Sequence, residues 1–146
     1  MKKEINLSIT IATEKDCAEL GIMNRAMADD GGANNNMTVL ELQERMKKFM
    51  KTNYIAVFFV VNGERVGYAL IDKTCNPMFI RQFFIKSEFR RKGYGTAAFK
   101  EILRYFNIDQ ISLSVLKSNT IGQKFWDSCG LIPYEIVMHY CRGGQV

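Results

Sequence analysis

An Asn-Gly pair near the middle of the chain, Asn62-Gly63, separates two β-rich segments at residues 54–61 and 65–72. Asn-Gly between such segments is the strongest short-range signal for a two-residue β-hairpin, because both turn positions need positive φ. A third segment, residues 78–85, is too apolar for a strand with one face in water. The middle of the chain is therefore expected to form an antiparallel pair followed by a buried strand.

Helical patterns flank these strands on both sides. Residues 5–11 alternate apolar and polar, as in a half-buried strand, and Thr13 opens a first helix that is expected to end before Asp29. A Gly- and Asn-rich loop leads to Thr38 and Glu41, a capping box for a helix that ends near Lys51. Further elements are expected at residues 95–106 (helix), 111–115 (strand), 119–128 (helix) and 136–140 (strand). The order β-α-α-β-β-β-α-β-α-β predicts a mixed α/β fold with about six strands.

The 146 residues are 47% hydrophobic and 24% charged, which suits one compact domain over residues 1–146 and excludes a disordered or collagen-like chain. Four widely spaced cysteines without a C-x-x-C pair, and the single histidine His139, do not predict a metal site or a Cys/His nucleophile. Neither a secretory signal nor a membrane span is expected, since the longest apolar run covers seven residues, 55–61. A cytoplasmic protein with reduced thiols is the expectation.

The net charge of +5 belongs entirely to the second half of the chain. Residues 1–80 hold ten basic and ten acidic side chains, whereas residues 81–146 hold ten basic and five acidic ones. An excess of this kind favours phosphate groups, nucleic acid or an anionic surface as partners.

Three of these basic residues lie in a short segment between the buried strand and the following helix, Arg90-Arg91-Lys92-Gly93-Tyr94-Gly95, which is expected to form a turn. The unpaired first-turn amides of a helix attract anions, and glycines let a phosphate oxygen approach the backbone closely. The turn therefore predicts a pyrophosphate site. The alternative is a charged run that only solvates one face of the helix.

The run from Ile85 to Gly95 resembles the acyl-CoA signature of the GNAT superfamily of N-acyltransferases, R/Q-x-x-G-x-G/A between the fourth strand and the third helix. A second GNAT signature is similar to Asn119-x-x-Gly122-x-x-Phe125-Trp126-x-x-x-Gly130-Leu131. The order of elements matches over essentially the whole chain. The resemblance implies a central sheet of six to seven strands, splayed between the fourth and fifth strands.

The resemblance also implies an acetyl-CoA or related acyl-CoA co-substrate, no metal, and direct transfer of the acyl group to a primary amine. The pantetheine arm would pair with the backbone of the fourth strand, and the amide of Ile85 would stabilise the oxyanion. The residues expected to bind the cofactor are Phe83, Phe84, Ile85, Arg90, Arg91, Lys92, Gly93, Tyr94, Gly95, Thr96, Asn119, Phe125 and Trp126.

The chain departs from the GNAT pattern at Trp126, where many members have a tyrosine that protonates the CoA thiolate. An indole N–H cannot give up its proton at useful pH, so water or another tyrosine would have to act. Tyr134 and Tyr94 are candidates, each with a structural role as the alternative. The strand at residues 78–85 also lacks the glutamate that serves as general base in some members, and Asp72 is a weak substitute.

The acceptor is a small-molecule or peptide amine that the sequence does not identify. Asp29 and Asp30 could attract a cationic amine, or lie in a solvated connector. Arg81 could bind an acceptor carboxylate, or extend into solvent from the sheet edge. Two alternatives to a small-molecule enzyme remain: a CoA-binding module that lost catalysis, and an enzyme acting on a nucleic-acid-associated amine. Nucleic acid is the less expected partner, because the basic excess lies at the presumed CoA turn; no membrane partner is expected, and the chain is a monomer or homodimer.

Overall fold

The computed structural model describes residues 4–31 and 35–144. The strands are β1 (Leu7–Ile11), β2 (Tyr54–Val61), β3 (Glu64–Asp72), β4 (Met78–Ile85) and β5 (Ile111–Leu113). The helices are α1 (Cys17–Gly31), α2 (Val39–Met50), α3 (Tyr94–Tyr105) and α4 (Thr120–Ser128), with short 3-10 turns η1 (Glu14–Asp16) and η2 (Ser87–Phe89). None of the helices in these residues is both long and apolar enough to cross a membrane.

The chain divides into two compact units, residues 1–116 and 117–146, which are described separately. In the first unit, five strands form one sheet in the order β1-β2-β3-β4-β5. Neighbouring strands are antiparallel except for β4 and β5, which are parallel. The expected mixed α/β class is confirmed, although the described residues form five strands and not six or seven.

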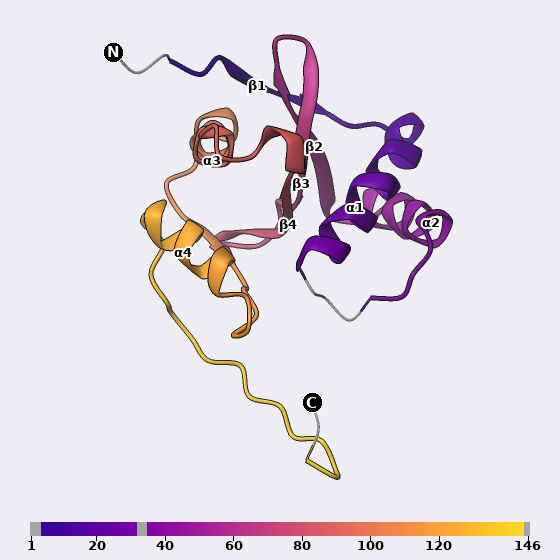
Figure 1. The fold of residues 1–146 in the computed structure, drawn as a ribbon, viewed down its shortest axis with the longest axis vertical. Helices are drawn as coiled ribbons and strands as arrows, with labels where there is room; N and C mark the ends of the chain where they lie inside the picture. The colour runs from indigo at the N-terminus through magenta and orange to yellow at the C-terminus, as the bar shows by residue number, and fades with distance from the viewer. Residues whose placement is uncertain (1–3, 32–34, 145–146) are drawn as a thin grey trace. The chain divides into compact units, whose positions relative to one another are not determined.

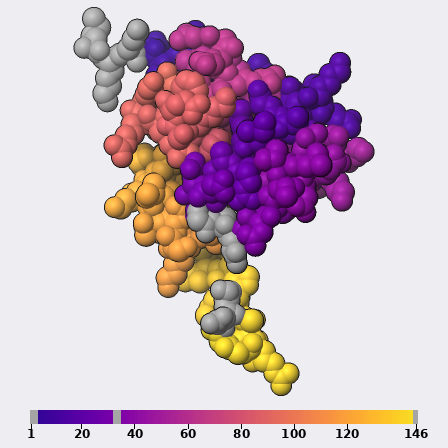
Figure 2. All heavy atoms as spheres, turned by 45° about the vertical axis from the view of Figure 1, so that its right-hand side comes forward, coloured from indigo at the N-terminus to yellow at the C-terminus, as the bar shows by residue number. Residues whose placement is uncertain are grey.

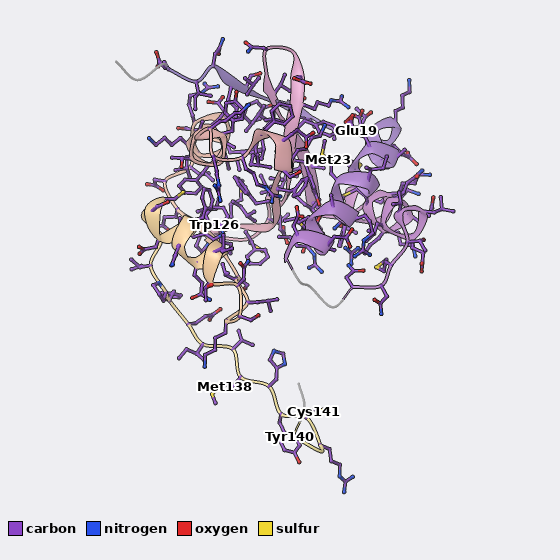
Figure 3. All side chains as sticks on the ribbon, viewed as in Figure 1. Glu19, Met23, Trp126, Met138, Tyr140 and Cys141 are labelled. Carbon is purple, nitrogen blue, oxygen red and sulfur yellow. The ribbon has the colours of Figure 1, made fainter. Side chains whose placement is uncertain are left out.

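Helices cover both faces of this sheet. Helices α1 and α2 lie side by side on one face, called here the α1/α2 face, and α3 lies on the opposite side (Figure 1). Gly21 allows the close approach of α1 and α2, because a Cβ there would lie 3.0 Å from the carbonyl oxygen of Val39. The two helices form one continuous surface in the space-filling view (Figure 2). Met23, on the side of α1 toward the sheet, belongs to the buried core of this face (Figure 3).

The register of β3 and β4 contains a β-bulge at Arg81. Leu70 pairs with Gln82 but the next residue, Ile71, pairs with Ile80, so Arg81 is the extra residue on β4. Gln82 therefore shares the face of Leu70, which is in the α1/α2 core, while Ile80 shares the opposite face with Ile71. A regular strand would have placed Ile80 and Gln82 on the same face.

The expected end of the first helix is wrong. The first helix does not end before Asp29 but continues to Gly31. It continues because Asp29 pairs with Arg25 one turn earlier, at 2.9 Å, and Asp30 pairs with Arg90, at 2.7 Å. These cations compensate two carboxylates at the negative end of the helix dipole.

The strand expected at residues 136–140 is also wrong. This segment of the second unit is an extended, irregular chain whose apolar side chains are exposed, and Met138, Tyr140 and Cys141 are seen along it in Figure 3. Alternation of apolar and polar residues supplies the pattern of a strand, but a strand also needs a hydrogen-bonded neighbour. Nothing in residues 117–144 provides one.

Candidate functional site

The fourth strand extends well beyond its pairing with β5. Strand β5 pairs with β4 only at residues 78–80, and β4 continues for five residues to Ile85. The pairing therefore ends at Ile80, immediately before the bulge residue Arg81. This is the splay between the fourth and fifth strands that the sequence resemblance implies.

The backbone groups of Phe83 and Ile85 point away from β3, and the carbonyl oxygen of Ile85 accepts a hydrogen bond from Arg90 Nε. The N–H of Lys86 donates to the carbonyl oxygen of Val66 at 2.8 Å, so Lys86 faces β3. Hydrogen-bonding direction alternates along an antiparallel strand, and the backbone groups of Phe83 and Ile85 consequently face away from β3, on the edge of β4 along which β5 pairs with residues 78–80. An extended ligand with amide groups could add to the edge there, as a further strand would.

The basic turn and the start of α3 follow β4 after the short 3-10 turn η2. Arg91 (φ 60°) and Gly93 (φ 79°) both have left-handed backbone conformations, which a tight turn of alternating handedness requires. The first helical hydrogen bond runs from the N–H of Ala97 to the carbonyl of Gly93, at 3.1 Å. The amides of Tyr94, Gly95 and Thr96 therefore precede the helical ladder, and the first turn holds no acidic residue. Arg91 and Lys92 are exposed beside these amides.

Arg90 links three parts of the first unit and does not simply extend into solvent. Its Nε donates to the carbonyl oxygen of Ile85 at 2.9 Å, and its Nη2 pairs with Oδ2 of Asp30 at 2.7 Å. The guanidinium also lies 5.5 Å from the centre of the Phe84 ring. Arg90 therefore holds the end of β4 against the end of α1, and its charge is partly neutralised before any phosphate arrives.

Tyr94 has a packing contact, since its ring centre lies 6.3 Å from that of Phe89. The two acidic residues expected near the acceptor are both ion-paired, Asp29 with Arg25 and Asp30 with Arg90. Neither carboxylate is in a solvated connector, because both lie in α1.

A buried polar network, which no sequence pattern indicated, lies under α1 and α2. Tyr68 Oη donates to Oε1 of Gln82 at 2.7 Å, and Arg45 Nη2 donates to Oδ1 of Asn24 at 3.2 Å. Gln82 Nε2 lies 3.5 Å from the same Asn24 oxygen, which joins the two pairs. Burial raises the pKa of Tyr68 far above its ordinary value, so its hydroxyl stays protonated. The network exists because the bulge turns Gln82 toward α1.

Gly67 affects the site indirectly, by allowing β3 to lie close to the end of β4. A Cβ at this position would lie 2.0 Å from the carbonyl oxygen of Phe84, so β3 and β4 approach closely only because residue 67 has no side chain. A lone glycine inside a strand pattern is a signal of close backbone approach, and it was available in the sequence.

The remaining predicted residues belong to the second unit. Asn119 caps α4 by accepting the N–H of Gly122 at 2.9 Å. Phe125 and Trp126 pack edge to face with ring centres 4.7 Å apart (Trp126 is labelled in Figure 3). Tyr134 is 94% exposed. What these residues contribute to a CoA site stays a prediction from the resemblance.

A cavity of about 360 Å³ lies at the other end of the sheet, near the start of β2. It is lined partly by Lys47, Lys51 and Lys73 and contains none of the predicted site residues. The candidate site is a strand edge beside a helix N-terminus, and such an edge does not enclose a cavity.

Comparison with known proteins identifies the family of this chain. The family model described as the acetyltransferase (GNAT) family matches residues 23–131, which is 109 of the 146 residues. The chain therefore belongs to the GNAT acetyltransferase family. No curated protein matches it.

Solved structures share the fold at low identity. A possible acetyltransferase from Clostridium difficile 630 is 18% identical, with a TM-score of 0.75 over 94% of this chain and 97% of that one. The aminoglycoside N-acetyltransferase AAC(6')-Iy, solved with CoA, is 13% identical, with a TM-score of 0.73 over 97% of each chain. A predicted acetyltransferase from Clostridium acetobutylicum, solved with acetyl-CoA, is 15% identical, with a TM-score of 0.71 over 96% and 99%.

Proposed function

We propose that this protein transfers the acetyl group of acetyl-CoA, or a related acyl group, to a primary amine within a ternary complex. One observation carries the proposal: β4 extends beyond its pairing with β5 and leads, through the short turn η2, into a basic, glycine-containing turn at the N-terminus of α3. An acyl-CoA is a molecule with both complementary parts, an amide-bearing arm and a pyrophosphate.

Acyl transfer of this kind requires mainly that the amine and the thioester are held in the reacting geometry. The neutral amine nitrogen attacks the thioester carbonyl and loses one proton, the C–S bond breaks, and CoA leaves as a thiolate that takes up one proton. The amide N–H of Ile85, which points away from β3, is positioned to stabilise charge on the carbonyl oxygen as it develops. Holding both reactants in the reacting geometry supplies a large part of the rate enhancement.

The predicted site has few side chains that could act as a general acid or a general base in proton transfer. The part of β4 beyond its pairing with β5 carries no carboxylate, and Trp126 stands where many GNAT enzymes have a tyrosine. A thiol with an ordinary pKa of about 8.5 leaves readily as a thiolate, so water can serve as the proton donor. Trp126 also favours the second candidate function, a CoA-binding module without turnover.

Binding of acetyl-CoA and free CoA to the full chain tests the proposal. Both are expected to raise the melting temperature at micromolar concentration. The variant Gly93→Val should lose this effect, because a β-branched residue is strained at φ 79° and its Cβ would lie 3.2 Å from Cδ1 of Ile5. No shift with either ligand in the wild-type chain would refute acyl-CoA binding altogether.

Release of CoA thiol over a panel of amines separates enzyme from binding module. Turnover with any amine supports the enzyme. Tight binding with no turnover supports the module, and a gain of activity in Trp126→Tyr would then identify the missing proton donor.

A further inference from the structure

Two arginines lie near one aromatic ring on the α1/α2 face, at the level where β4 separates from β5. Arg81 is the bulge residue of β4, and Arg45 projects from α2. Their guanidinium carbons lie 5.0 Å and 5.6 Å from the centre of the same Phe49 ring. Arg81 also donates to the hydroxyl of Tyr54, at 3.3 Å.

Neither of these arginines has a carboxylate partner among the residues that the structure describes. Elsewhere in the same residues, a carboxylate pairs with each of Arg25, Arg65, Arg90 and Arg104. Arg45 makes one hydrogen bond, to Asn24, while its buried Nε has no partner in the described chain. Arg81 is exposed.

The pair is electrostatically unfavourable as it stands. Burial lowers the pKa of Arg45, and the positive charge of Arg81 lowers it further. Two like charges held against one aromatic ring, one of them with a buried unpaired donor, are stabilised most by an anion between or beside them. A carboxylate suits guanidinium groups best, because its two oxygens match the planar fork.

We infer that Arg45 and Arg81 bind a carboxylate group of the acceptor, so that the substrate is an amine that also carries a carboxylate, as an amino acid does. The inference rests on the proposed acetyl transfer. The amine nitrogen attacks the thioester at the part of β4 beyond its pairing with β5, and the carboxylate lies on the α1/α2 face at the bulge, where that part begins. The products are the N-acetylated carboxylate and CoA.

This placement disfavours polycationic acceptors. Aminoglycosides and polyamines would bring positive charge toward two arginines that lack counter-ions. The acidic residues that might have attracted such acceptors, Asp29 and Asp30, are already paired with Arg25 and Arg90. The acceptor therefore differs in charge from that of the aminoglycoside acetyltransferases with a similar fold.

Matched pairs of amines test the inference on the full chain. L-Amino acids are compared with their decarboxylated amines, for example phenylalanine with phenethylamine and lysine with cadaverine, with spermidine and kanamycin as carboxylate-free polycations. Binding to the CoA-saturated protein is measured by calorimetry, and CoA thiol release from acetyl-CoA is measured in parallel. The carboxylated member of at least one pair should bind roughly 10- to 100-fold more tightly than its partner.

Two variants and a control assign that preference to the arginines. Arg81→Gln should remove the preference by raising KM for the carboxylated amine, with kcat and the KM for acetyl-CoA little changed. Arg81→Lys should retain part of it, because the charge stays but the planar fork is lost. Arg104→Gln is the matched control, since Arg104 on α3 already pairs with Glu101. Exposed Arg81 is changed in preference to Arg45, whose loss would disturb the buried network.

The outcomes separate this inference from the proposed function. If acetyl-CoA does not bind, both fail. If acetyl-CoA binds but no carboxylated amine binds better than its partner, or if polycations are preferred, the carboxylate site alone is overturned. An undiminished preference in Arg81→Gln would overturn it as well.

Discussion

Gly67 lies at the contact that places the end of β4, and Gly67→Ala is the sharpest test of how the site is built. The new Cβ would lie 2.0 Å from the carbonyl oxygen of Phe84 and 3.0 Å from the Cα of Ile85. An ordinary van der Waals contact begins near 3.4 Å, so the two strands must separate by about 1.4 Å. The displaced segment of β4 includes the Ile85 amide proposed to stabilise the oxyanion.

Two effects of different size follow from this displacement. Forcing extra volume into a packed sheet costs about 1–3 kcal/mol, which is a fall in melting temperature of roughly 2–12 °C for a chain of this size. Function should suffer more than stability, because a 1 Å misplacement of reacting groups can reduce the rate about 100-fold. Acetyl-CoA affinity should fall as well, since the strand edge that would receive the arm has moved.

Thermal melting with and without acetyl-CoA measures both effects in one experiment, and turnover adds the rate once an acceptor is known. Gly31→Ala is the matched control: the same change at the last residue of α1, where a Cβ would meet nothing within 4 Å. It should leave melting temperature and ligand response close to wild type. If Gly67→Ala behaves like this control, the close approach of β3 does not determine the position of β4.

Further substitutions test residues that contact this strand. Arg90→Gln should weaken acetyl-CoA binding several-fold in a binding titration. Asp30→Asn, which removes the partner of the Arg90 guanidinium, should not weaken it. If both variants lose the same affinity, the role of Arg90 is structural and it does not bind the phosphates. Tyr68→Phe should lower stability at pH 7 by about 1–3 kcal/mol, measured by urea unfolding, because Gln82 loses a buried donor. The folded-state pKa of Tyr68 is raised above the unfolded value of about 10, so its contribution is complete below pH 10 and declines as the pH rises further. The difference between wild type and Tyr68→Phe should therefore shrink above pH 10, and a constant difference would contradict the buried hydroxyl.

Features set by neighbouring residues in the chain could be predicted from sequence. The hairpin at Asn62-Gly63 has positive φ at both residues, 52° and 77°, as its turn type requires. The capping box of Thr38 and Glu41 is present, with the Glu41 amide donating to the Thr38 hydroxyl at 3.1 Å. Both depend on contacts within three residues, and residue type alone specifies them.

Features that depend on distant residues could not be predicted. The length of α1 depends on the ion pair between Asp30 and Arg90, and Arg90 lies 60 positions away in the sequence. The pairing of Gln82 with Tyr68 depends on the register of two strands, which no local pattern reports. The sequence identified Arg81 as a candidate for binding a carboxylate, but Arg45, its neighbour in the structure, carried no motif.

The bulge at Arg81 explains why the edge of β4 and the arginine pair occur at the same level of the sheet. A bulge adds twist to the strand that contains it, which turns β4 away from β5, and the pairing with β5 ends at Ile80. The same extra residue reverses the alternation, so that Arg81 and Gln82 both face α1 and α2. One irregularity thus ends the pairing with β5 along the part of β4 that we propose to bind acyl-CoA, and it directs polar groups toward the side from which the proposed acceptor would approach. A change that restored regular pairing would bury Gln82 against α3 and remove both features together.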